Sequence, residues 1–211
     1  MSDALTLAGN VDAVVIGASA GGVEALSVLL PALPAGLPMP VFVVLHLPRE
    51  RPSLLVEIFQ PKCALPVREA EDKEPVEAGV VYIAPPDYHL LVDTGPRISL
   101  SADEPVHFSR PSIDVLFESA ADIYGARLLA IVLTGANEDG AAGAAAVEQA
   151  GGKVLVQHPD SAQSSLMPAA TIKRVGAAGA RELPALAALL AALGPPGHGA
   201  RRNAQARRVQ R

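Results

Sequence analysis

The segment "VVIGASAGGVEAL" (residues 14–26) decides the fold, because it joins an apolar strand to a helix through a glycine-rich turn. The run 11–17 is rich in β-branched residues and ends at a glycine, and residues 21–33 have helical spacing. Ser19, at the tip of the turn, fits three roles: a nucleophile lifted above a sheet, part of a phosphate-binding loop, or a small residue in a tight corner. The phosphate pattern Gly-x-Gly-x-x-Gly is not met, because Ser19 stands where its second glycine belongs.

Further apolar runs alternate with helical patterns after this segment. We predict buried strands at residues 39–46, 127–135 and 153–157, and helices at 51–59, 110–125, 138–152 and 182–194. Ser112 is the expected N-cap of the helix at 110–125. Between residues 65 and 102, four short strand-like pieces separated by Pro, Gly and Asp predict antiparallel hairpins. The sequence therefore predicts an α/β fold: a doubly wound, mostly parallel sheet flanked by helices, with an antiparallel β-hairpin insertion.

The length of the chain limits the number of domains, and its charge limits the class of partner. The chain has 211 residues, of which 50% are hydrophobic and 18% charged, and this is typical of one globular domain. We predict a domain at residues 1–194 and a basic, disordered tail at 195–211, which contains arginines and no acidic residue. The net charge is −5 and the predicted domain alone is more acidic, so we expect no nucleic-acid partner.

The sequence indicates a cytoplasmic protein. Cys63 is the single cysteine, so no intrachain disulfide can form, and this is typical of a reducing compartment. We see no signal peptide and no run of about 18 apolar residues, so we expect no direct membrane insertion. No His, Cys or Asp cluster has the spacing of metal ligands, and we expect neither a metal nor another cofactor. The sequence does not predict the oligomeric state.

Polar side chains follow three of the predicted parallel strands. Ser19, His46 and the pair Glu138–Asp139 come after successive buried strands, and the carboxyl ends of parallel strands form the ligand-binding edge of such sheets. A serine needs a neighbouring base to become nucleophilic, and a carboxylate can orient that base. His158 also follows a strand and is the rival base. The pattern does not separate Glu138 from Asp139.

With these segments the chain resembles the catalytic domain of the CheB-type chemotaxis protein-glutamate methylesterases. The resemblance runs from about residue 11 to 193 and is carried by "IGASAGG", "VVLHLP", "AEDKEPVEAGVVYIAPPDYHLLV", "RPSIDVLFESAA" and "LTGANEDGAAG". It implies a catalytic triad of Ser19, His46 and Asp139. It also implies a substrate, the γ-glutamyl methyl esters on the cytoplasmic helices of methyl-accepting chemoreceptors, and in some members deamidation of receptor glutamines. We expect the oxyanion to be held by backbone N–H groups near residue 20 and in the 135–138 loop.

The sequence departs from the family pattern at three places. Ala20 stands where the family commonly has Thr, and "TGANEDG" (134–140) stands where a Gly-Met-Gly form is expected. We see no receiver domain before the first strand, so we expect a stand-alone catalytic unit that is not switched by phosphorylation in cis. Ala20 and the missing receiver domain keep one alternative open, a low-activity regulatory or binding module in a chemosensory-like pathway. A second alternative, a nucleotide-binding Rossmann-like domain, is disfavoured by Ser19 in place of the glycine.

Overall fold

A seven-stranded parallel sheet forms the centre of the computed structural model, which describes residues 10–47 and 53–194. The strands are β1 (Ala13–Ala18), β2 (Val41–Leu45), β3 (Val67–Glu69), β4 (Val81–Ile83), β7 (Leu128–Val132), β8 (Lys153–Gln157) and β9 (Ala180–Arg181). They lie in the order β3-β4-β2-β1-β7-β8-β9, and every neighbouring pair is parallel. The fold class predicted from the sequence is confirmed.

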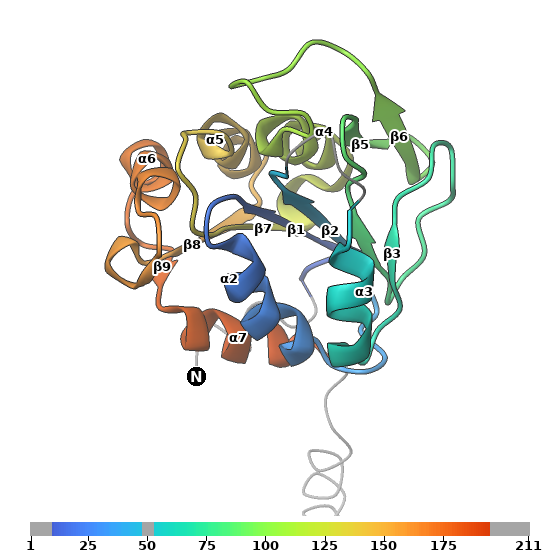
Figure 1. Cartoon of the computed structure of the whole chain (residues 1–211), viewed down its shortest axis with the longest axis horizontal. Coiled ribbons are helices and arrows are strands. Elements are labelled where there is room, and N and C mark those ends of the chain that lie inside the picture. Colours follow the sequence, from blue (N-terminus) through green and yellow to red (C-terminus); the bar gives the residue numbers. More distant parts are fainter. Residues whose placement is uncertain (1–9, 48–52, 195–211) are drawn as a thin grey trace, which may run out of the picture.

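Helices cover both faces of this sheet (Figure 1). One face is covered by α2 (Gly22–Leu29), α3 (Leu55–Phe59) and α7 (Leu183–Ala191), and the other by α4 (Ile113–Tyr124), α5 (Ala141–Gln149) and α6 (Leu166–Val175). The antiparallel hairpin of β5 (His89–Asp93) and β6 (Arg97–Ser101) packs beside α4. Short 3-10 turns occupy Leu30–Ala32, Gln60–Lys62, Gly125–Arg127 and Pro159–Ser161.

The burial of both faces explains the unbroken apolar strands. In β1, Val14 and Ile16 pack in the core under α2, whereas Ala13 and Val15 pack in the core under α4. Each fully buried Val or Ile side chain contributes about 1.5–3 kcal/mol of transfer free energy, so either face can hold β1 in place. Continuous hydrophobicity is therefore what this strand position requires.

Two of the four pieces predicted as hairpins belong to the main sheet instead. Within residues 65–70 and 79–86, β3 and β4 pair in parallel with each other, and β4 also pairs in parallel with β2. The physical reason lies in β4, where Val81, Tyr82 and Ile83 are all buried and need cover on both faces. The antiparallel prediction is correct only for the β5–β6 hairpin.

Other boundaries differ by a few residues. The helix predicted at 21–33 ends as α2 at Leu29 and continues as a 3-10 turn that contains Pro31. No element was predicted for α6, and the helix predicted at 51–59 begins at Leu55 within the described residues. The predicted tail at 195–211 lies outside the described residues.

The order of the strands creates a switch point at β1. The chain leaves β1 toward β2 and β4 on one side and returns as β7 on the other. In such sheets the ligand crevice lies at the carboxyl ends of the strands where the order reverses. The segments after β1, β2 and β7 carry Ser19, His46 and Asp139, so the sheet brings these three segments to one edge, as predicted.

Candidate active site

Asp139 is the most deeply buried charged side chain at this edge. Its side chain has no exposed area. Within the described residues its carboxylate accepts hydrogen bonds from His46 Nε2 (2.8 Å), Ser112 Oγ (2.8 Å), and the backbone N–H groups of Ile113 (2.7 Å) and Asp114 (3.0 Å). Burial raises the pKa of Asp139, but the hydrogen bonds from His46 and the two backbone groups outweigh burial and hold that pKa below its usual value. The carboxylate is therefore ionised at neutral pH.

Through these contacts Asp139 pairs with the start of α4, although in the sequence it directly precedes the start of α5. The N-cap of α5 is Gly140, which has no capping side chain, whereas Asp139 accepts the otherwise unpaired N–H groups at the first turn of α4. The positive end of the α4 dipole favours a negative charge there. Glu138, the other candidate acid, is two-thirds exposed and lies 3.9 Å from His107 instead. The contact with His46 is made by Asp139.

The contact with Asp139 fixes which nitrogen of His46 is basic. An ionised carboxylate only accepts hydrogen bonds, so Nε2 carries the proton and Nδ1 presents its lone pair. Two side chains approach Nδ1: Ser109 Oγ at 3.4 Å and Asn137 Nδ2 at 3.5 Å. The His46 N–H also donates to the Ala18 carbonyl at 3.1 Å, which ties the base to the end of β1.

Ser19 occupies the turn directly after β1 and is partly buried. Its N–H donates to the Thr134 carbonyl at 2.9 Å, and its carbonyl accepts the Gly22 N–H at 2.8 Å. Across residues 10–47 and 53–194, no hydrogen bond joins Ser19 Oγ to His46. The structure thus brings His46 and Asp139 into contact and places Ser19 on the adjoining strand end.

The backbone donors expected for an oxyanion are only partly available. The Gly135 N–H donates to the Ser164 carbonyl at 3.1 Å, which removes it from the predicted set. The Ala20 N–H has no acceptor in the part of the chain that the structure describes. Thr134 Oγ1 donates to the Ala20 carbonyl at 2.8 Å and so orients the neighbouring peptide. Of the predicted set, only the Gly135 N–H is paired within the described residues, so the Ala20 N–H and those of residues 136–138 all stay candidate donors.

Two glycines allow the close packing of this edge. Gly21 has φ +79°, a left-handed conformation that starts α2 and that side chains other than glycine rarely adopt. Gly17 lies within β1, where a Cβ would sit 2.3 Å from Ile113 Cγ2. Since Ile113 donates to Asp139, the missing side chain of Gly17 lets α4 reach the position that holds the acid.

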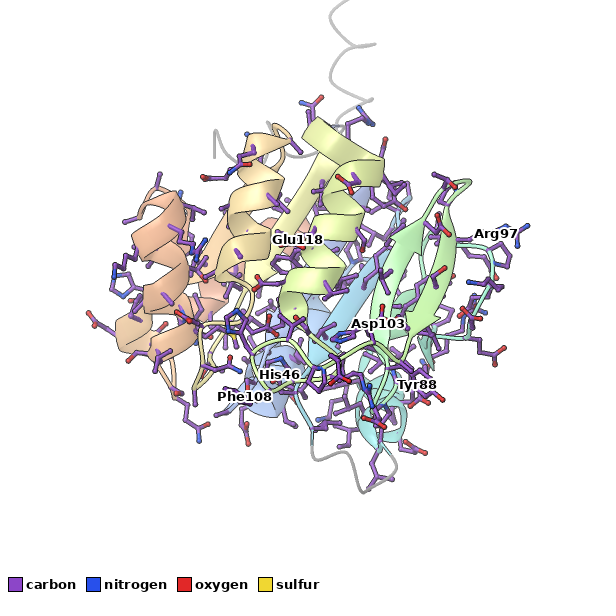
Figure 2. The ribbon with its side chains drawn as sticks, turned by 90° about the horizontal axis from the view of Figure 1, so that it is seen from above. His46, Tyr88, Arg97, Asp103, Phe108 and Glu118 are labelled. Atoms are coloured by element: carbon purple, nitrogen blue, oxygen red, sulfur yellow. The ribbon has the colours of Figure 1, made fainter. Side chains whose placement is uncertain are left out.

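A small pocket opens next to His46. Figure 2 labels two of its lining residues, His46 and Phe108. The pocket has a volume of about 60 Å³ and is lined by His46, Leu47, Phe108, Ser109, Arg110 and Pro111. Residues 105–111 were assigned no function from the sequence, because no short-range pattern shows that this segment returns to the end of β2. The contacts of Ser109 and Asn137 with His46 were not predicted from the sequence.

Asp114 is a second buried carboxyl group close to the first. Burial raises the pKa of Asp114 to about 6, and the charge of Asp139 adds to the rise, while the hydrogen bond from the Gly143 N–H (2.6 Å) opposes it. His107 Nε2 lies 3.4 Å from Asp114 Oδ2. The carboxyl group at 114 therefore holds its proton to higher pH than an ordinary aspartate.

The remaining candidates do not join the site. His158, the rival base, has a half-exposed side chain whose Nδ1 accepts the Asp160 N–H at 3.3 Å. His89 is buried, and its Nδ1 accepts the Ser112 N–H at 3.1 Å, which supports the start of α4. In the described residues there is no group of three His, Cys, Asp or Glu suited to a metal ion, and no helix is long and apolar enough to cross a membrane.

A doubly wound parallel sheet with a partly buried histidine held by a buried aspartate at its switch point is an arrangement of α/β hydrolytic enzymes. The chain belongs to the CheB methylesterase family, because the model of that family, described as "CheB methylesterase", matches residues 14–190. The family is one of protein-glutamate methylesterases, which are hydrolases.

Individual relatives agree with this assignment. A relative from Leptospira interrogans is 43% identical over 164 residues, which cover 78% of this chain and 85% of the relative. A "Protein-glutamate methylesterase/protein-glutamine glutaminase" from Symbiobacterium thermophilum is 41% identical over 165 residues, or 78% of this chain and 45% of that protein. The crystal structure of the Thermotoga maritima CheB methylesterase catalytic domain matches with a TM-score of 0.82 and 33% identity, covering 87% of this chain and 98% of that one.

Proposed function

We propose that the protein hydrolyses γ-glutamyl methyl esters on the cytoplasmic helices of chemoreceptors and releases methanol during chemotactic adaptation. The family membership and the names of the relatives support this activity. The observation that carries the proposal is the hydrogen bond of 2.8 Å between His46 and the ionised Asp139, at the sheet edge where Ser19 follows β1. An enzyme with this substrate works in the cytoplasm, the compartment expected from the sequence.

The proposed reaction starts with proton transfer from Ser19 Oγ to His46 Nδ1, because Nε2 is held by Asp139. As Oγ bonds to the ester carbonyl carbon, the carbonyl oxygen becomes negative, and the Ala20 N–H is the donor proposed to stabilise it. The C–OCH₃ bond then breaks, and methanol leaves with the proton from His46. Water, deprotonated by His46, hydrolyses the glutamyl-enzyme and leaves the receptor carboxylate and free Ser19. A glutamine substrate would follow the same steps and release ammonia.

One observation favours a second candidate, a regulatory or binding module with little turnover. Ser109 and Asn137 approach His46 Nδ1, whereas Ser19 Oγ makes no hydrogen bond with His46 in the described residues. If the two side chains keep Nδ1 occupied, the proton transfer from Ser19 is slow. The alternative therefore predicts a protein that binds receptor but releases methanol very slowly.

Labelling by a serine-directed fluorophosphonate separates the two candidates. The proposal predicts one adduct on Ser19, absent in Ser19→Ala and slow to form in His46→Ala, together with methanol release from methylated receptor. Ser27→Ala is the matched control, since Ser27 lies on α2 and accepts a hydrogen bond from Lys62 away from His46. An adduct on Ser109, or wild-type protein that is inert to both the label and the receptor, would contradict the proposed mechanism.

A further inference from the structure

Phe108 differs from the other phenylalanines of the chain. The sequence contains four, and the side chains of Phe42, Phe59 and Phe117 are completely buried. The side chain of Phe108 is 100% exposed. Aromatic side chains contribute most to stability when buried, so this position gains nothing for the core from an aromatic residue.

The backbone holds Phe108 in a tight turn. The N–H of Val106 donates to the Ser109 carbonyl at 3.1 Å, and the N–H of Ser109 donates to the Val106 carbonyl at 2.8 Å. Between them, His107 has φ 48° and Phe108 has φ 60°. This left-handed region favours Gly and Asn and is disfavoured for a bulky residue. The turn therefore keeps an aromatic residue where its backbone conformation disfavours one.

Contacts on both sides fix this turn to the rest of the domain. On one side His107 Nε2 lies 3.4 Å from Asp114 Oδ2 of α4. On the other side Arg110 forms an ion pair with Asp87 at 2.7 Å, and its Nη1 donates to the carbonyls of residues 102 and 103. Ser109 Oγ contacts His46 Nδ1 directly. The ring of Phe108 is thus presented at a defined place relative to the base.

That place is the rim of the pocket beside His46, which Phe108 also lines; Figure 2 shows the two residues next to each other. Any macromolecule that delivers an ester to His46 Nδ1 must therefore come close to the Phe108 ring. A helix with apolar side chains three and four positions apart offers a furrow into which one aromatic ring fits. An aromatic anchor of this kind typically carries much of the affinity of an interface.

We propose that Phe108 is the docking residue for the protein substrate: its ring packs between apolar side chains of the substrate helix and sets the modified glutamyl group over His46. This inference rests on the proposed function and adds the surface that recognises the substrate. It assigns Phe108 no part in the bond-making steps. The contribution should therefore be visible with a protein substrate and nearly absent with a small ester.

Phe108→Asn tests this assignment without disturbing the turn, because Asn tolerates the left-handed conformation. The probes are the purified cytoplasmic domain of a chemoreceptor carrying glutamyl methyl esters, and p-nitrophenyl acetate. We expect kcat/KM on the receptor to fall about 30-fold, mainly through KM, and turnover of the small ester to change less than about threefold. Phe108→Trp should restore receptor turnover to within about threefold. Val28→Ser, at a partly exposed position on α2, is the matched control and should leave both activities unchanged.

Three outcomes would overturn the assignment. They are full receptor activity in Phe108→Asn, an equal loss of activity on both substrates, or an oligomeric state that changes in Phe108→Asn and returns in Phe108→Trp. Receptor binding measured in the Ser19→Ala background keeps the two proposals separate. Wild-type protein that releases no methanol from the methylated receptor defeats the proposed function, and a Ser19→Ala protein that still releases methanol defeats the role of Ser19 in it. Equal receptor affinity of Ser19→Ala with and without Phe108→Asn defeats the docking role alone.

Discussion

Among single residues, Asp139 combines a structural and a chemical contact in one carboxylate. Its Oδ2 accepts from both His46 Nε2 and the Ile113 N–H, and its Oδ1 accepts from Ser112 Oγ and the Asp114 N–H. The first contact orients the His46 imidazole, and the others complete the first turn of α4. Because one side chain makes both kinds of contact, a substitution there changes the chemistry and the fold together.

Asp139→Asn should lower methanol release by about 10³–10⁴-fold, because a neutral amide neither fixes the proton on Nε2 nor stabilises the imidazolium. The melting temperature should fall as well, since the charge at the start of α4 is lost. Glu138→Gln is the matched control and should change neither quantity much, because Glu138 is largely exposed. A fully active Asp139→Asn protein would argue against the proposed triad.

Asp114 predicts a specific dependence of stability on pH. Burial and the neighbouring charge of Asp139 raise its pKa to about 6, so between pH 4 and 6 the folded state binds more protons at this group than the unfolded state. Its contribution to stability is therefore greatest at acid pH and is lost as pH rises through 6. Asp114→Asn removes this dependence, so the melting temperature of the variant relative to wild type should increase from pH 4 to pH 7. A difference that stays constant over this range would contradict the raised pKa.

Among the elements, the contact between β1 and α4 determines where the acid is held. Gly17 in β1 lies against Ile113, the first residue of α4, and Ile113 donates to Asp139. The distance between strand and helix is thus set by a missing side chain. The helix cannot move outward without carrying the N–H groups that bind the carboxylate away from it.

Gly17→Ala should lower both stability and activity, because its Cβ would lie 2.3 Å from Ile113 Cγ2. Overpacking of this kind typically costs about 1–3 kcal/mol, and we expect a loss of methanol release larger than the loss of folded protein. Adding Ile113→Ala removes the clashing atoms and should restore part of the activity. Denaturant unfolding and methanol release, measured together, check the prediction; a double variant no better than Gly17→Ala would contradict this explanation.

The elements themselves were predictable to different degrees. The strand predicted at 153–157 is β8 to the residue, because its apolar run is bounded by Gly152 and a polar end. β3 and β4 were predicted as hairpins, since the flanking Pro and Gly are typical of turns and the pairing of β4 with β2 spans a long stretch of chain. α6 was not predicted; it contains Pro168, a residue that disfavours a helix interior.

At the scale of the whole molecule, the candidate site and much of the core are separate. His46 and Asp139 lie at the carboxyl edge of the sheet, whereas α7 packs against α2 on one face. Leu190 of α7 is completely buried there. Substitutions of the buried residues of α7 should therefore lower the stability of the fold without changing the geometry of the candidate site.

Leu190→Ala should destabilise the protein by about 2–5 kcal/mol through lost burial and a residual cavity. Below its melting temperature, the folded variant should keep the kcat of the wild type for p-nitrophenyl acetate. Active-site titration with the fluorophosphonate gives the fraction of folded enzyme needed for this comparison. A kcat that falls in proportion to stability would indicate that α7 is coupled to the site.

The edge where the candidate site lies followed from the sequence, but its details did not. Buried strands that end at Ser19, His46 and the 137–139 segment predict a shared edge from the geometry of parallel sheets alone. The choice of Asp139 over Glu138 came from the family resemblance, and the contact with His46 agrees with it. Ser109 could not be predicted as a site residue, because it lies 63 residues after His46 in the chain. Its position beside His46 depends on how the segment 105–111 folds back toward the end of β2.

The hydrogen bonds from the start of α4 also provide a means of observation. The Ile113 and Asp114 amide protons point at the same carboxylate that orients His46. Their nuclear magnetic resonance shifts and their exchange with deuterium should therefore respond when Asp139 is protonated or when an inhibitor charges the imidazole. Two ordinary backbone signals in a helix thus serve as an internal, label-free reporter of the electrostatic state of the site.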